Sequence, residues 1–135
     1  IPDFRGLVFF NSLSDLGATE ERLQFNGASA VSLASDINVK FRKVILEKFK
    51  NHEISLLLGT DLLARGIDIE NLEVVINFDI PRDREAYTHR AGRTGRMGNE
   101  GSVISLVTHP EDLKKLKKFA KVSELVLKNQ ELHEK

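Results

Sequence analysis

Short apolar segments alternate with longer segments of mixed character along most of this chain. The apolar segments are rich in β-branched and aromatic residues, which is typical of strands that are buried on both faces. They occupy residues 7–11, 30–33, 54–59, 72–78 and 102–107. We therefore expect five strands in the interior of the fold.

The segments between these strands have the length and polar content of helices. They span residues 14–26, 39–51, 83–91 and 110 onward, with a short helix near 61–65. Asp83 is a plausible N-cap just after Pro81, and Pro110 suits the first turn of the last helix. Strands that alternate with crossover helices predict an α/β fold, with a mostly parallel sheet covered on both faces and right-handed connections.

The composition narrows the class of protein. A chain of 135 residues has the length of one ordinary domain with one core. It has no cysteine and four scattered histidines, so we expect no disulfide, no structural zinc and no bound metal. No apolar run is long enough to span a membrane, and we expect a cytoplasmic protein. The first residue is Ile1 in what looks like a connecting segment, so we expect a piece of a longer polypeptide.

The charges are balanced overall but unevenly distributed. Twenty acidic residues cancel twenty basic ones, which argues against a globally basic nucleic-acid-binding protein. Five of the arginines nevertheless lie within residues 82–96. The lysine-rich run 113–121 has apolar residues at helical spacing, so its lysines are expected on the solvated face of an amphipathic helix.

Unusual residues follow the third strand, in the string "GTDLLARGID" at 59–68. Ligands of open parallel sheets gather at the carboxyl ends of the strands, so this loop is a candidate binding segment. Thr60 offers a hydroxyl, and the short helix that follows could receive a phosphate on its free N–H groups. Gly66 permits a tight turn that leaves Arg65 and Asp68 above the sheet. Ordinary helix capping by Thr60 and Asp61 is the alternative.

The string "YTHRAGRTGR" at 87–96 combines a histidine and three arginines with two glycines. If a helix continues to residue 96, then His89, Arg93 and Arg96 lie on one face. The two glycines would cost such a helix roughly 2 kcal/mol, so they indicate either a close approach of the backbone or a loop. Arginine forks suit a polyphosphate, whereas surface salt bridges with acids such as Glu85 are the alternative.

Two features of a complete nucleotide site are missing from the sequence. There is no G-x-x-x-x-G-K-[ST] loop, and no Asp-Glu pair in a strand-end setting indicates a magnesium site. The chain therefore has arginines for a phosphate but nothing to cradle the nucleotide.

These strings together resemble a known family. "LLGTDLLARGIDIENLEVVINFDIP" and "YTHRAGRTGRMG" resemble motifs V and VI of the DEAD-box RNA helicases of superfamily 2, and "LVFFNS" resembles motif IV. The resemblance covers nearly the whole chain to about residue 120 and implies the second, C-terminal RecA-like domain of the helicase core, with a P-loop NTPase-type fold. We expect residues 1–122 to form this domain and 123–135 to be a helical extension or the start of a linker.

The resemblance implies an ATP site shared between two domains. Arg93 and Arg96 match the catalytic, ATP-binding arginines of motif VI, with Arg96 as the arginine finger, and Asp68 matches the residue near the ribose. Arg65 and His89 match interdomain contacts. ATP with Mg²⁺ is the implied cofactor, and the N-terminal RecA-like domain, absent from this chain, would hold the Mg²⁺.

The resemblance also implies half of a track that binds the RNA backbone without sequence preference. The matching positions are Asn11, Arg42, Thr60 and Gly66. The sequence departs from the family's usual residues with Val39 in place of glutamine, "ASD" at 34–36 in place of His-Gly-Asp, and Gly59 in place of alanine.

Three functions follow from these patterns. The first is the second core domain of an ATP-dependent RNA helicase that unwinds short duplexes, inactive and monomeric in isolation, with RNA and its own N-terminal domain as partners and no membrane. The second is the same domain of a DNA-directed helicase of superfamily 2. The third is a stand-alone nucleic-acid-binding module without an ATPase partner. A P-loop and an Asp-Glu-Ala-Asp box encoded upstream of Ile1 would support the first.

Overall fold

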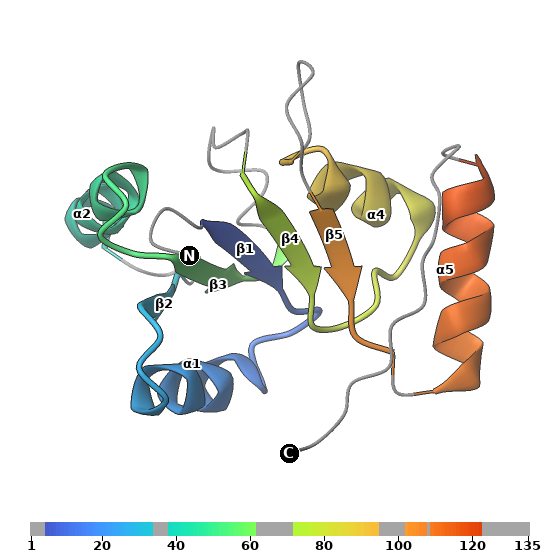
Figure 1. The fold of residues 1–135 in the computed structure, drawn as a ribbon, viewed down its shortest axis with the longest axis horizontal. Coiled ribbons are helices and arrows are strands. Elements are labelled where there is room, and N and C mark those ends of the chain that lie inside the picture. Colours follow the sequence, from blue (N-terminus) through green and yellow to red (C-terminus); the bar gives the residue numbers. More distant parts are fainter. Residues whose placement is uncertain (1–4, 34–37, 62–71, 95–101, 108, 123–135) are drawn as a thin grey trace.

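Five parallel strands form one sheet at the centre of the computed structural model, which describes residues 5–33, 38–61, 72–94, 102–107 and 109–122 (Figure 1). The order across the sheet is β2-β3-β1-β4-β5, and every neighbouring pair is parallel. The strands are β1 (Gly6–Phe9), β2 (Ala30–Ser32), β3 (Leu56–Gly59), β4 (Val74–Asn77) and β5 (Ser102–Ser105). All five predicted strands are confirmed, each shorter than its apolar run.

Helices occupy the segments between the strands, as the sequence predicts. They are α1 (Leu16–Phe25), α2 (Val39–Lys50), α4 (Arg84–Ala91) and α5 (Pro110–Val122). Asp83 is confirmed as the N-cap of α4, because its side chain accepts a hydrogen bond of 2.8 Å from the Ala86 N–H. Of the short helix expected near 61–65, Asp61 is helical and the other positions lie outside the described residues.

The two faces of the sheet are covered by different helices. On one face Phe49 of α2 packs with Leu57 and Val75, and on the other Leu16 of α1 packs with Leu58. Successive residues of a strand point to opposite faces, so the inner strands β1, β3 and β4 place apolar side chains on both faces of the sheet. Helices on both faces of a parallel sheet confirm the predicted α/β architecture.

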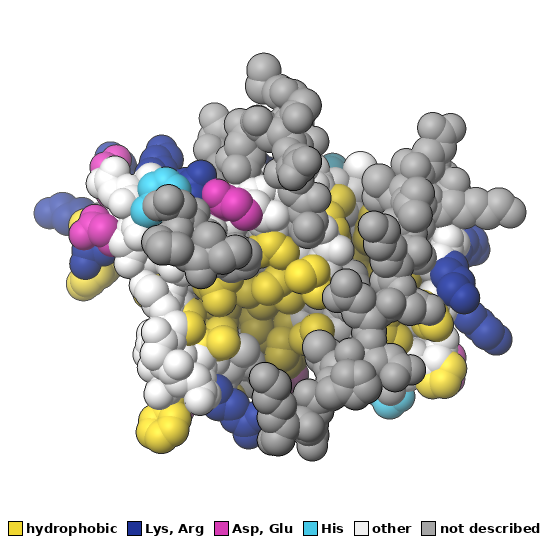
Figure 2. All heavy atoms as spheres, viewed as in Figure 1, with side chains coloured by type: hydrophobic (Ala, Val, Ile, Leu, Met, Phe, Trp, Pro, Cys, Tyr) yellow, Lys and Arg dark blue, Asp and Glu magenta, His cyan; other side chains and the backbone are white. Residues whose placement is uncertain are grey.

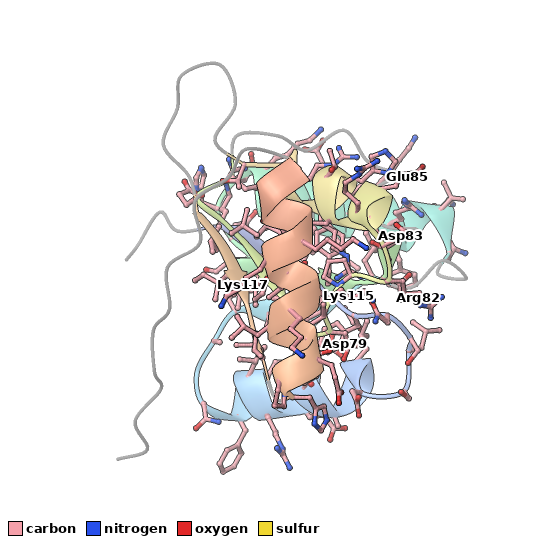
Figure 3. All side chains as sticks on the ribbon, turned by 90° about the vertical axis from the view of Figure 1, so that its right-hand side faces the viewer. Asp79, Arg82, Asp83, Glu85, Lys115 and Lys117 are labelled. Atoms are coloured by element: carbon pink, nitrogen blue, oxygen red, sulfur yellow. The ribbon has the colours of Figure 1, made fainter. Side chains whose placement is uncertain are left out.

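α4 and α5 meet beyond the edge of this core. Ile80, Tyr87 and Leu116 form a third buried cluster that joins the two helices. Both helices lie on the β5 side of the sheet (Figure 1). Lys115 and Lys117 point to opposite sides of α5 in Figure 3. Leu116 is buried and Lys114, Lys117 and Lys118 are exposed, as the predicted amphipathic helix requires, whereas Lys115 is half-buried, so not every lysine of the run lies on the solvated face. In the part of the chain that the structure describes, no helix is long and apolar enough to cross a membrane.

The buried phenol of Tyr87 is expected to make this chain less stable at high pH. Burial raises the pKa of its phenol above the ordinary value of 10.0, because the phenolate would lose hydration. A pKa raised by folding leaves stability unchanged below the unfolded-state pKa and lowers it as pH rises through the folded-state pKa. We expect the free energy of unfolding to decrease above about pH 10, and to decrease less in Tyr87→Phe.

Spectroscopy can follow this group alone, because the chain has one tyrosine and no tryptophan. The phenolate absorbance of the folded 135-residue chain should rise at a higher pH than that of the urea-unfolded chain. Equal midpoints in the two states would show that Tyr87 is accessible to water in the fold.

Candidate functional site

Arg90 of α4 is fully buried and all five of its N–H donors are engaged. Its Nε and Nη2 atoms donate to the two carboxylate oxygens of Asp61, at 2.7 and 2.9 Å. Nη1 donates to Asn77 Oδ1 at 3.2 Å and to the Asp79 carbonyl at 2.8 Å. Nη2 also donates to Asn11 Oδ1 at 2.8 Å. A buried guanidinium is stable when a paired charge and acceptors of this kind replace its hydration.

The acceptors of Arg90 come from segments that are far apart in the sequence. Asn11 follows β1, Asp61 follows β3, and Asn77 and Asp79 lie at the end of β4. The guanidinium carbon also lies 5.2 Å from the centre of the Phe9 ring, within the range of a cation–π contact. Arg90 therefore connects α4 to the carboxyl ends of three adjacent strands.

Asn11 forms hydrogen bonds in this network through both its backbone and its side chain. Its N–H donates to Asp79 Oδ2 at 2.8 Å, and its Nδ2 donates to the Ile80 carbonyl at 2.9 Å. Its own carbonyl accepts from Arg82 Nη2 at 3.0 Å. Both polar atoms of the Asn11 side chain are thus used within the protein, and they order the loop after β1.

A pocket of about 480 Å³ opens above the same strand ends. Asn11, Thr60 and His89 all line it, so three of the residues predicted from the sequence lie together. Thr60 is half-buried and His89 is exposed. Charged side chains complete the wall, and Figure 3 shows Arg82, Asp83 and Glu85 together at the start of α4. The pocket thus offers a hydroxyl, an imidazole and charges of both signs.

Arg93 lies away from this pocket, beyond the other end of α4. The helix ends at Ala91, and the chain then turns and pairs with the residue stretch that precedes β4. The Leu72 N–H donates to the Arg93 carbonyl at 3.1 Å, and the Thr94 hydroxyl donates to the Leu72 carbonyl. The sequence left open whether residues 85–96 form one continuous helix or end in a loop. The described part ends the helix at Ala91 and continues as a turn, so His89 and Arg93 do not share one helical face.

Several predicted positions are placed elsewhere or are not described. Arg42 lies half-buried in α2 and does not line the pocket. Arg65, Gly66, Asp68 and Arg96 lie outside the described residues. No group of three or more His, Cys, Asp or Glu side chains that could hold a metal ion occurs in the described ranges.

The sequence interpretation missed Arg90 as the organising residue of the site. A signal was present, because Arg90 follows Tyr87 by three positions and therefore lies on the same, buried side of α4. An arginine at a buried helical position requires several acceptors nearby. Its acceptors could not be named from the sequence, since they lie on three different strands.

Comparison with known proteins identifies the fold and the family. Residues 2–98 match the family model described as the helicase conserved C-terminal domain. The ATP-dependent RNA helicase DeaD of Escherichia coli strain K12 is 37% identical over 87 residues, which are 64% of this chain and 14% of that protein. DeaD of Buchnera aphidicola from Acyrthosiphon pisum is 38% identical over the same length, with the same shares covered. The chain thus spans about a seventh of these relatives.

Solved structures show the same arrangement of strands and helices. The C-terminal domain of the DEAD-box protein Dbp5 superposes with a TM-score of 0.82 at 28% identity, covering 91% of this chain and 72% of that one. A DEAD-box protein of the hyperthermophile Methanococcus jannaschii gives a TM-score of 0.79 at 34% identity, covering 93% of this chain and 34% of that one. The RecA-like fold expected from the resemblance is therefore confirmed. The chain belongs to the helicase conserved C-terminal domain family.

Proposed function

We propose that this chain is the second core domain of an ATP-dependent RNA helicase. The observation that carries the proposal is the Arg90 network, which brings the loops after β1 and β3 and the helix α4 around one pocket. Arg93 lies beyond the opposite end of α4. We assign RNA to the strand ends and nucleotide to the region near Arg93.

The RNA contacts are proposed for the carboxyl edge of the sheet. The half-buried hydroxyl of Thr60 lines the pocket there and can donate to a phosphate oxygen, and Arg42 of α2 supplies a positive charge. The Asn11 side chain is already bonded within the protein, so its proposed contribution is to shape the loop that contacts RNA. Gly66 joins this set from the resemblance alone. Contacts of this kind recognise the backbone and carry no base sequence.

The nucleotide contacts are proposed for the arginines. Arg93 fits a triphosphate chemically, because a guanidinium stays charged and binds oxyanions with two parallel hydrogen bonds. Arg96 as the arginine finger and Asp68 near the ribose complete the proposed set. Bound Mg²⁺ would neutralise phosphate charge during hydrolysis. Following the family resemblance, we assign the metal to the N-terminal domain.

Closure of the two domains would then couple RNA binding to ATP hydrolysis. His89 is exposed on α4 beside the pocket, where it can contact an opposing domain, and Arg65 is proposed for the same contact. Phosphoryl transfer depends mostly on positioning and charge neutralisation, so an arginine supplied from a second body can limit hydrolysis to the closed state. RNA bound across both domains would favour that state, and hydrolysis would release it. The cytoplasmic location and the monomeric state of the isolated domain stay predictions.

Measurements of ATP turnover test this function. The 135-residue chain alone should hydrolyse no ATP with or without RNA, because it lacks a P-loop and magnesium carboxylates. Joined to its natural N-terminal domain, it should give turnover that single-stranded RNA stimulates more than single-stranded DNA. Turnover by the chain alone would contradict the proposal. Equal stimulation by DNA would favour a DNA-directed helicase, and an inactive joined protein that binds RNA would favour a binding module.

A further inference from the structure

The helix α2 exposes apolar side chains that the core does not use. Phe49 at its last turn is fully buried, whereas Phe41 in its first turn is 65% exposed. Val39 and Val44 are also exposed, at 69% and 51%. Residues two positions apart point to opposite sides of a helix, so Val39 and Phe41 do not form one stripe. Phe41 therefore forms a separate exposed aromatic surface; of its apolar neighbours on the helix, Val44 is exposed and Ile45 packs against the core.

The first turn of α2 lies at the same edge of the sheet as Thr60. The ring of Phe49 lies 5.5 Å from the guanidinium carbon of Arg5, which precedes β1, so the last turn of α2 is at the amino edge. The helix connects β2 to β3, and these strands are parallel neighbours. Its first turn must therefore lie at the carboxyl edge, where Thr60 follows β3.

The charge around Phe41 favours a polyanion as its partner. The helix contains one acidic residue, Glu47, and the five basic residues Lys40, Arg42, Lys43, Lys48 and Lys50. This excess is local, because the whole chain has a formal net charge of zero. In Figure 2 several Lys and Arg side chains lie around α2 on the left of the molecule, with Asp and Glu side chains among them. Lys40 and Arg42 flank Phe41 directly in the chain.

We propose that Phe41 stacks on a base of the single-stranded RNA whose phosphates contact the carboxyl edge. Sequence-tolerant single-strand binding combines cations along the backbone with an exposed aromatic ring, because every base has a flat face that can stack. A protein helix docking on α2 would instead need a continuous apolar stripe, which Val39 and Phe41 do not provide. The inference rests on the proposed function and adds a contact to the bases themselves.

Binding of labelled single-stranded RNA to the intact helicase, with a non-hydrolysable ATP analogue, tests the stacking. Phe41→Ala should weaken binding about tenfold, and Phe41→Trp should retain it. Phe25→Ala is the matched control, because Phe25 is 90% exposed at the end of α1, on the opposite face of the sheet, and should have no effect. Because Phe41 is exposed, its replacement should leave the melting temperature unchanged.

A second RNA distinguishes contacts to the bases from contacts to the backbone. An oligonucleotide of equal length with abasic sugars keeps the phosphates but removes the stacking partners. Wild-type protein should bind it about as weakly as Phe41→Ala binds normal RNA, and Phe41→Ala should lose nothing further. Equal weakening of both RNAs by Phe41→Ala would overturn stacking.

Three further outcomes distinguish a failure of the stacking inference from a failure of the proposed function. If Phe41→Ala binds RNA like wild type while RNA still stimulates ATP turnover, the stacking inference fails and the proposed function stands. This holds equally if the substitution weakens only the binding of an acidic peptide, since the surface would then serve a protein. If the wild-type protein binds no RNA, the proposed function itself fails.

Discussion

Replacement of Arg96 by alanine in the two-domain protein is expected to lower the rate of ATP turnover about 10³-fold. The proposed role of this guanidinium is to stabilise negative charge that develops on the transferred phosphoryl group. That interaction is stronger in the transition state than in the bound substrate, so its loss should lower kcat. Nucleotide binding should weaken far less, because in the proposed two-domain arrangement the N-terminal domain would hold ATP without Arg96. Steady-state turnover and nucleotide titration measure the two effects separately.

Controls distinguish catalysis from folding in this experiment. Arg96→Lys should restore little activity, because an ammonium cannot reproduce a planar bidentate fork. Arg22→Ala removes an exposed arginine from the last turn of α1 and should leave turnover unchanged. Melting temperatures should stay near wild type for both alanine variants. The catalytic role would be refuted if Arg96→Ala unfolded the domain while its folded fraction kept full activity.

Replacement of Arg90 by alanine is expected to destabilise the domain by about 3 kcal/mol. The substitution leaves a void beside Phe9 and removes the donor for Asn77 Oδ1, an atom of a fully buried residue. Breaking a buried ion pair costs about 3 to 5 kcal/mol. We expect the lower end, because the Asp61 side chain is 34% exposed and can recover some hydration. Against a typical stability of about 5 to 15 kcal/mol, this loss is large.

Urea unfolding of the chain measures this loss. Arg84→Ala on the same helix is the matched control, because Arg84 is exposed, and it should change stability by less than about 0.5 kcal/mol. Arg90→Lys should recover only part of the loss, because lysine has three donors where the site uses five. An unchanged urea midpoint for Arg90→Ala would show that the network does not hold the strand ends together.

The hydrophobic pattern by itself determined the elements of this fold. Buried parallel strands require continuous apolar runs, and each of the five runs overlaps one strand. Local chemistry also determined where α4 begins, since Asp83 caps it through a hydrogen bond only three residues along the chain. The two-residue difference between some predicted and observed strand ends has a simple cause. Apolar residues such as Phe10 continue into the core beyond Phe9, the last residue of β1 that pairs in the sheet.

The tertiary structure alone decided how the site is assembled. Strand order and the partners of Arg90 depend on contacts between distant residues, such as the 79 positions that separate Arg90 from Asn11. In the sequence Arg90 is one of several clustered arginines. In the fold it is the buried one, and it joins the loops after β1 and β3. Tertiary contacts also determined where α4 ends, because the chain after Gly92 pairs with Leu72 instead of adding another helical turn. Local propensity could not decide between a longer helix and a turn after Gly92, since the competing hydrogen bonds come from Leu72, which is distant in the sequence.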